Sequence, residues 1–151
     1  MNRNSHGLAM YRIEKSREHL KSADILLKAG MYGDSLSRSY YAIFTAARAL
    51  LALKHFDSKK HSGIISLFNQ HYVKTGIVDR AMGKELNKAR LRRESSDYAD
   101  FYLVDKEEAV NQLETAKKFI AVVENIIKKT ITDNCKKEHS CSVNQFITAT
   151  L

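Results

Sequence analysis

The sequence predicts an all-α fold, an up-and-down antiparallel bundle of four to five helices. Its 151 residues suit one domain with a hydrophobic core. The chain contains no proline, the residue that most strongly interrupts a helix because it removes a backbone hydrogen-bond donor. Apolar residues recur at helical spacing along most of the chain, and no segment shows the alternation that is typical of a strand.

The first expected helix covers residues 9–29 and is followed by Gly30, which suits the left-handed conformation after a helix. The second helix is expected to begin at Asp34 or Ser35, since either side chain can cap it, and to end near His55. Apolar and aromatic residues occupy two of its faces. We therefore expect this helix to contact two neighbours and to lie at the centre of the bundle.

A shorter helix is expected over residues 62–74. Asp79 is expected to cap the next helix, which should end between Ser95 and Tyr98. Gly83 weakens that helix by roughly 1 kcal/mol relative to alanine, because glycine has more backbone freedom to lose.

The last long helix is expected to begin after Asp105, with Glu108 at the position of a capping box. It is expected to end at Lys128–Lys129, as the helix dipole favours. Residues 1–129 are therefore predicted to form the bundle. Residues 130–151 lose the apolar pattern, and they are predicted to be a C-terminal tail that is either disordered or contains one short helix.

The chain carries a net charge of +8, which can indicate an anionic partner such as nucleic acid or merely a solvated lysine surface. No N-terminal apolar segment resembles a signal peptide. No apolar run approaches the ~18 residues of a membrane helix, so we expect no membrane association and a cytoplasmic location. Cys135 and Cys141 are too few for a disulfide scaffold.

The segment RLRRESSDY, residues 90–98, is the most distinctive candidate site. Arg93 continues the apolar stripe of its helix and should point into the bundle, whereas Arg92 should be a surface charge. Asp97 lies one turn later and can pair with Arg93. The pair is either a structural tie or a means of holding the arginine rigid so that it binds phosphate. Tyr98 and Tyr102 could then flank the phosphate or stack on a base. (Arg90 is expected on the flank of the helix.)

The second helix supplies further candidates. Tyr40 and Phe44 are expected to be core residues. Tyr41 and Arg48 share the other face and are candidates for a polar site or a dimer contact. Arg38 precedes them and is a further candidate for binding phosphate.

The histidines and the C-terminal segment give weaker signals. His61 and His71 could transfer protons, but neither has a partner nearby in sequence, so we expect solvated or capping residues. Cys135, His139 and Cys141 form a C-x3-H-x-C run that lacks a fourth ligand, so no metal site and no cofactor are expected. No P-loop, nucleophile elbow, dinucleotide-binding loop or HExxH motif is present.

Several motifs in a fixed order resemble the HEPN domain family, whose name stands for higher eukaryotes and prokaryotes nucleotide-binding. The resemblance covers residues 11–129. It depends on the order and spacing of the motifs more than on any one of them. The motifs are Ser37-Arg38-Ser39-Tyr40-Tyr41-Ala42-x-Phe44, His61-Ser62-Gly63 with Phe68, Lys74-Thr75-Gly76, Arg93-x3-Asp97-Tyr98, and Ala116-x2-Phe119.

The resemblance implies a compact antiparallel bundle that forms a homodimer and is encoded beside a minimal nucleotidyltransferase. In several such pairs the HEPN protein is a metal-independent RNA-cleaving toxin, and the nucleotidyltransferase is its antitoxin. Active members carry an Arg-x4–6-His motif. Here Tyr98 stands at that spacing from Arg93, and tyrosine is a poor base near neutral pH because its usual pKa is about 10.

Three functions follow from the resemblance and the residues together. The first is a HEPN component of a toxin–antitoxin-like pair that binds nucleotide or RNA phosphate near Arg93. The second is an endoribonuclease toxin with a degenerate Arg-x4-Tyr motif, in which Arg93 and Tyr98 are catalytic. The third is a dimeric scaffold without a ligand.

Overall fold

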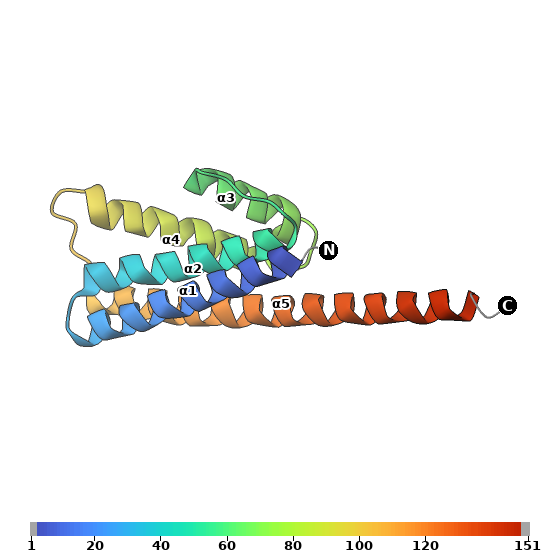
Figure 1. Cartoon of the computed structure of the whole chain (residues 1–151). Coiled ribbons are helices and arrows are strands. Elements are labelled where there is room, and N and C mark those ends of the chain that lie inside the picture. Colours follow the sequence, from blue (N-terminus) through green and yellow to red (C-terminus); the bar gives the residue numbers. More distant parts are fainter. Residues whose placement is uncertain (1–2, 149–151) are drawn as a thin grey trace.

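The computed structural model describes residues 3–148 of the chain and the side chains of residues 4–139. The described part is an all-α bundle without a strand, which confirms the predicted fold class. Figure 1 shows α1 and α2 side by side as an antiparallel pair, with α5 along them and α3 and α4 on the other side of α2. The elements are α1 (Arg3–Lys28), α2 (Tyr32–Leu53), α3 (His61–Phe68), the π-helical segment η1 (Asn69–Val73), α4 (Arg80–Tyr98) and α5 (Lys106–Thr148).

Helix α2 is the central element, as its two apolar faces predict. It contacts α1, α3, α4 and α5. Tyr40, Ile43 and Leu50 are fully buried, and Phe44 is nearly so, which confirms that Tyr40 and Phe44 belong to the core. A helix enclosed by four neighbours holds its side chains in fixed rotamers, so it is a rigid support for the groups that project from its ends and flanks.

Small residues bring α1 and α2 close together. The buried Ser16 hydroxyl donates to the Ala42 carbonyl at 2.7 Å, and the buried Ser35 hydroxyl donates to the Ala23 carbonyl at the same distance. Each hydroxyl therefore finds a partner inside the interface, as a buried polar group requires. Ser35 is used in this contact and does not cap α2.

Two helix starts differ from the expected ones. Helix α1 begins at Arg3 instead of residue 9, and Ser5 is already buried. Helix α2 begins at Tyr32, after Met31, and no side chain caps it. The predicted cap at Asp34 or Ser35 is therefore wrong.

The third and fourth helices follow the predicted pattern more closely. Helix α3 ends at Phe68, and η1 carries the chain on to Val73 where one helix to Lys74 was expected. Asp79 is the residue before α4, as predicted, although its side chain makes no capping hydrogen bond. Helix α4 ends at Tyr98, within the predicted range.

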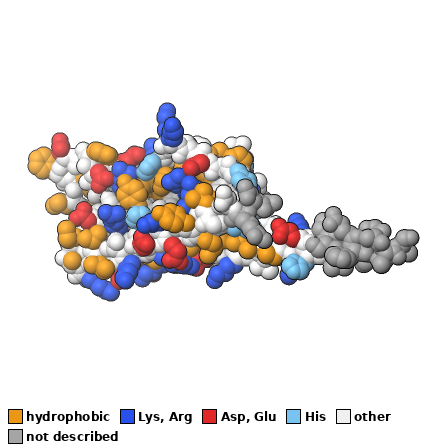
Figure 2. Space-filling model, viewed as in Figure 1, with side chains coloured by type: hydrophobic (Ala, Val, Ile, Leu, Met, Phe, Trp, Pro, Cys, Tyr) orange, Lys and Arg blue, Asp and Glu red, His pale blue; other side chains and the backbone are white. Residues whose placement is uncertain are grey.

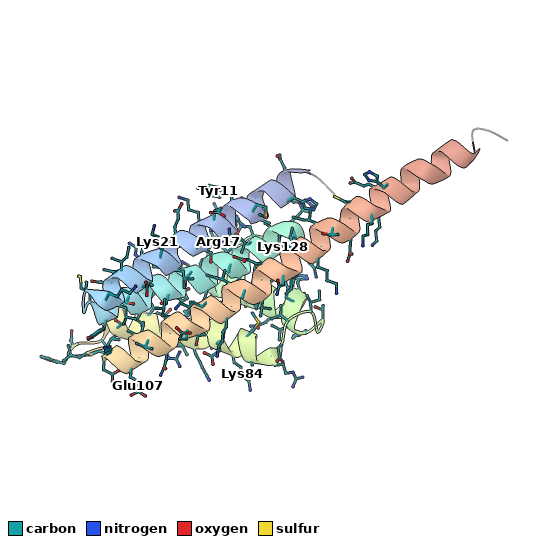
Figure 3. All side chains as sticks on the ribbon, turned by 90° about the horizontal axis from the view of Figure 1, so that it is seen from below. Tyr11, Arg17, Lys21, Lys84, Glu107 and Lys128 are labelled. Atoms are coloured by element: carbon teal, nitrogen blue, oxygen red, sulfur yellow. The ribbon has the colours of Figure 1, made fainter. Side chains whose placement is uncertain are left out.

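Helix α5 is longer than expected. Asp105 accepts a hydrogen bond from the backbone N–H of Glu108 at 2.8 Å, which confirms the predicted cap. The predicted end at Lys128–Lys129 is wrong, because the helix continues to Thr148 and extends beyond the bundle (Figures 1 and 3). No glycine or proline follows residue 129, so nothing interrupts the backbone hydrogen bonds even though the apolar stripe ends.

The first part of α5 is attached to the bundle by packing and by a charged pair. Arg17 of α1 lies beside α5 in Figure 3, and its Nε donates to Glu124 at 2.8 Å. Ala116, Phe119 and Val123 are buried against the other helices. That residues 130–151 form a region separate from the bundle stays a prediction, and the side chains of residues 140–151 lie outside the described part.

Gly83 has a packing role that its helix propensity does not reveal. A Cβ at this position would lie 2.5 Å from Asn69 Oδ1 and 3.0 Å from Val73 Cγ2, both in η1. Valine is stiff at χ1, so this contact is not easily relieved. The absence of a side chain is therefore what allows α4 to approach η1.

We expect Gly83→Ala to lower the free energy of unfolding by about 1 kcal/mol, because an overpacking cost of about 1–3 kcal/mol exceeds the gain in helix propensity. Gly7→Ala is the matched control, since nothing lies within 4 Å of a Cβ there. It should raise the free energy of unfolding by roughly 0.5–1 kcal/mol. Urea denaturation of both variants measures the difference, and an equal effect of the two substitutions would contradict the packing role.

Candidate functional site

Arg93 lies on the face of α4 that packs against α2, as its helical position predicts. Its side chain is 14% exposed, and its Nε donates to Asp97 Oδ2 at 3.0 Å. Its guanidinium carbon lies 5.5 Å from the ring centroid of Tyr40 and 5.3 Å from that of Tyr41. Asp97 also accepts a hydrogen bond from the Ser37 hydroxyl at 3.3 Å. The guanidinium is therefore held by both α2 and α4.

The pair with Asp97 occupies only one of the three guanidinium nitrogens. Within the described part of the chain, neither terminal nitrogen of Arg93 donates a hydrogen bond to a protein group. Burial acts to lower the pKa of Arg93, but the hydrogen bond to Asp97 and the nearby Tyr41 raise it overall. Arg93 is thus a fixed cation with free donors, an arrangement that suits an oxygen anion.

His61 is half-buried at the start of α3 and lies close to the Arg93 site. Its Nδ1 lies 2.8 Å from the Tyr40 hydroxyl. Its ring stacks on Phe44 with the centroids 4.3 Å apart and the planes 16° apart. The expectation of a solvated or capping histidine is wrong, because Lys60 is the residue before α3 and the His61 ring packs between aromatic side chains.

Burial lowers the pKa of His61 from its ordinary value of 6.5, and the positive charges of Arg93, Arg90 and Arg48 lower it further. Burial likewise raises the pKa of Tyr40 to about 12, so its hydroxyl keeps its proton at neutral pH. His61 is consequently a neutral imidazole at neutral pH, with its orientation fixed by a protonated hydroxyl.

An open pocket of about 810 Å³ lies between the start of α3 and α4. Its lining includes the cations Lys59, Lys60, Arg90 and Arg93, together with His61. On the face shown in Figure 2, blue Lys and Arg side chains are interspersed with red Asp and Glu, pale blue histidine and orange hydrophobic side chains. A concave surface lined by several cations concentrates anions.

The loop before α3 is held against it by a close backbone approach. A Cβ at Gly63 would lie 2.8 Å from the Ser58 Cβ, so only glycine leaves room for this loop. Within the loop, Ser58 Oγ accepts a hydrogen bond from the backbone N–H of Lys60 at 3.2 Å. The position of Lys59, Lys60 and His61 in the pocket therefore depends on Gly63.

A second pocket of about 530 Å³ adjoins the first, and His61 and Lys59 line both. Arg48, a predicted site residue, lies here, and its Nη2 donates to both carboxylate oxygens of Asp57 at 3.1 Å. Arg12 donates to the same carboxylate at 3.1 Å. Asp57 thus engages two arginines, which leaves Arg48 less available to an anion than Arg93.

The two tyrosines after Arg93 are separated. Tyr98 is 76% exposed at the end of α4 and lines the larger pocket. The Tyr102 hydroxyl donates to Glu108 at 3.4 Å, and its ring lines a different pocket near Gly33. The structure therefore places Tyr98 with Arg93 and does not place Tyr102 there. The Glu108 carboxylate accepts from Tyr102 and is not seen to complete a capping box.

The remaining arginines have individual roles. Arg90 donates to Glu94 at 2.9 Å and faces the pocket from α4. Arg92, which was expected to be a surface charge, donates through Nη1 at 2.8 Å to Gln112, a fully buried residue of α5. Its side chain is nevertheless 42% exposed, so Arg92 is a surface charge that also contacts α5. Arg38 is exposed, outside the pocket lining, and its charge contributes to lowering the pKa of His19.

The lowered pKa of His61 predicts how stability depends on pH. The unfolded state binds more protons than the folded state between the folded pKa and 6.5. The free energy of unfolding should therefore decrease as the pH falls below 6.5. Burial lowers the pKa of His19 as well, so both histidines contribute to the pH dependence of stability in wild type.

Urea denaturation at about pH 7.5 and about pH 5 checks this dependence. We expect His61→Gln to lose less stability than wild type between these two pH values. His19→Gln should remove the part of the pH dependence that comes from His19. An unchanged pH dependence in His61→Gln would show that the imidazole is solvated in the folded protein.

The described residues form neither a candidate metal site nor a helix that could span a membrane. No group of three or more His, Cys, Asp or Glu residues there could hold a metal ion. Cys135 and His139 are exposed on α5, and the side chain of Cys141 lies outside the described part. No helix among the described residues combines the length and the apolar character needed to span a membrane.

Comparison with known proteins gives one family and several relatives. The sequence profile of the HEPN domain matches residues 9–126. A UPF0332 protein of Pyrococcus horikoshii is 46% identical over 78 residues, which cover 52% of this chain and 55% of that protein. A UPF0332 protein of Thermotoga maritima is 33% identical over 114 residues, 76% of this chain and 86% of that protein. A Methanocaldococcus jannaschii protein named "Putative toxin" is 34% identical over 122 residues, 79% of this chain and 88% of that protein.

Proposed function

Because this chain belongs to the HEPN domain family, we propose that it is the HEPN component of a toxin–antitoxin-like pair whose other member is a minimal nucleotidyltransferase. We propose also that it binds a nucleotide or RNA phosphate at Arg93. The toxin assignment is supported by two Methanocaldococcus jannaschii relatives that are each named "Putative toxin". The phosphate assignment is supported by the site itself.

The observation that most supports a phosphate site is that the two terminal guanidinium nitrogens of Arg93 donate no hydrogen bond to a described group. Asp97 accepts a hydrogen bond from Nε alone, and Arg93 lines a pocket together with Lys59, Lys60 and Arg90. A preoriented guanidinium binds two phosphate oxygens at a small entropic cost. The ion pair between Arg93 and Asp97 could also serve only to stabilise the end of α4, so the test of the site is a measurement of RNA binding.

Salt dependence gives the first test. If four cations each neutralise one phosphate of a single-stranded RNA, the logarithm of affinity should fall with the logarithm of salt concentration with a slope of about −3. Fluorescence anisotropy of a labelled 2′-O-methyl RNA at several salt concentrations measures this slope. A slope near zero, or no binding at low salt, would favour the dimeric scaffold without a ligand.

The tip between α4 and α5 supports a protein partner. Tyr98, Phe101 and Leu103 are 76%, 102% and 90% exposed and lie within six consecutive residues, of which Tyr98 also lines the candidate pocket. Exposed apolar side chains in such number commonly mark an interaction surface. A second copy of the chain and the nucleotidyltransferase are the two partners that we propose.

Co-expression tests the partner. The product of a neighbouring nucleotidyltransferase gene should co-purify with this chain, and Phe101→Asp should weaken the complex if the tip takes part. Light scattering of the free protein reports whether it is a homodimer. A chain that remains monomeric and never retains the nucleotidyltransferase would contradict both proposed partnerships.

A further inference from the structure

The two ring nitrogens of His61 have different surroundings. Nδ1 is engaged by the Tyr40 hydroxyl at 2.8 Å, and the ring is stacked on Phe44. Nε2 makes no hydrogen bond with any group in the described part of the chain, and His61 lines both pockets of the site. Nε2 is therefore the nitrogen that remains available to a bound molecule, on a ring whose orientation is already fixed.

Tyr40 connects His61 with Arg93. Its ring centroid lies 6.0 Å from that of His61 and 5.5 Å from the guanidinium carbon of Arg93. His61 and Arg93 line the same pocket from α3 and α4. A phosphate bound by the terminal nitrogens of Arg93 would accordingly lie in the pocket that His61 also lines.

We propose that His61 is the proton-transferring residue of this site and that the substrate is a phosphodiester of single-stranded RNA. The inference rests on the proposed phosphate site at Arg93. In α4, Tyr98 occupies the position after Arg93 at which the resemblance predicts a histidine. His61 of α3 would provide the missing imidazole.

The chemistry needs no further reactant than water. The 2′-oxygen of the RNA attacks the adjacent phosphorus, and its proton passes to Nε2 of His61. The P–O5′ bond breaks, and the leaving 5′-oxygen takes a proton from water. The resulting hydroxide takes the proton from Nε2. The products are a 2′,3′-cyclic phosphate and a 5′-hydroxyl end, while Arg93 stabilises the charge on the phosphoryl oxygens.

The Tyr40 hydroxyl suits this proton transfer because it both donates and accepts hydrogen bonds. When it accepts from Nδ1–H, Nε2 carries a lone pair and can remove a proton. When Nε2 has taken a proton, Nδ1–H remains bonded to Tyr40 and the ring does not turn. Burial and the neighbouring arginines lower the pKa of His61, so the neutral form that accepts a proton is present at neutral pH.

The test separates binding from cleavage. Wild type, His61→Ala, His61→Asn and Arg93→Ala would be incubated with a labelled single-stranded RNA, and binding would be measured with its 2′-O-methyl counterpart. His139→Asn is the control, because His139 is exposed on α5 and lines neither pocket. Mass spectrometry identifies the fragment ends.

We expect wild type and His139→Asn to release fragments that end in 2′,3′-cyclic phosphate and to leave the methylated RNA intact. Both His61 variants should bind the methylated RNA within about 3-fold of wild type but cleave the RNA at least roughly 100-fold more slowly. Added imidazole should restore part of the cleavage by His61→Ala, which a misfolded variant would not show.

Two results would overturn the inference. Cleavage by folded His61 variants at the wild-type rate would show that another group transfers the proton. Binding that depends on Arg93, without cleavage by wild type, would remove the His61 chemistry and leave the proposed phosphate site intact. Failure of the proposed site itself has a different signature, because Arg93→Ala would then bind the methylated RNA as wild type does.

Discussion

Replacing Arg93 with alanine is expected to weaken RNA binding roughly 10- to 100-fold, because hydrogen bonds to a charged group contribute about 1.5–3 kcal/mol. Arg93 supplies two free terminal nitrogens, and its position is fixed by Asp97, Tyr40 and Tyr41. The measurement is fluorescence anisotropy with 2′-O-methyl RNA at constant low salt. The stability cost should be small, since the pair with the 38% exposed Asp97 is accessible to solvent.

Two variants make this comparison specific. Arg80→Ala removes an equal charge from the exposed start of α4, outside the pocket lining, and should leave affinity within about 3-fold of wild type. Arg93→Lys keeps the charge but loses the planar fork, so it should restore only part of the affinity. Equal losses in Arg80→Ala and Arg93→Ala would indicate that only net charge matters.

Replacing Phe119 with alanine is expected to lower the free energy of unfolding by about 3–5 kcal/mol, a large share of the 5–15 kcal/mol that is usual for a domain. Phe119 is 2% exposed, and its ring centroid lies 5.7 Å from that of Phe68. Phe68 in turn stacks with Tyr72, at 5.9 Å between centroids. The substitution therefore opens a cavity between α5 and Phe68 of α3.

Urea denaturation measures this loss, and Val122→Ala is the matched control on the same helix. Val122 is 38% exposed, so its truncation should cost no more than about 1 kcal/mol. If Phe119→Ala lowers the free energy of unfolding as little as Val122→Ala does, the Phe119 ring is not packed against Phe68.

The periodicity of apolar residues was enough to predict the bundle and the orientation of Arg93. Met82, Leu86 and Ala89 define one face of α4, and Arg93 follows on that face, so its burial and its pair with Asp97 could be expected. The end of α4 was also predictable. The end of α5 was not, because a helix continues past its buried stripe when no residue interrupts it.

The presence of His61 and Arg93 in one pocket could not be predicted, because the two residues lie far apart in sequence and only the packing of α3 and α4 on α2 brings them to it. His61 has no partner nearby in sequence, which is why a solvated or capping residue was expected. Its contacts with Tyr40 and Phe44 come from α2, and no local pattern encodes them. The close approach at Gly63, which places the loop before α3, is likewise visible only in three dimensions.

The central claim, a phosphate bound between α3 and α4, is tested most directly by NMR titration of the intact chain with 2′-O-methyl RNA. The account predicts saturable shifts of the His61 ring and the Arg93 Nε–H signals with a common dissociation constant, while the signals of His139 stay unchanged. Saturable binding that leaves His61 and Arg93 unshifted, or that shifts His139 equally, would contradict it.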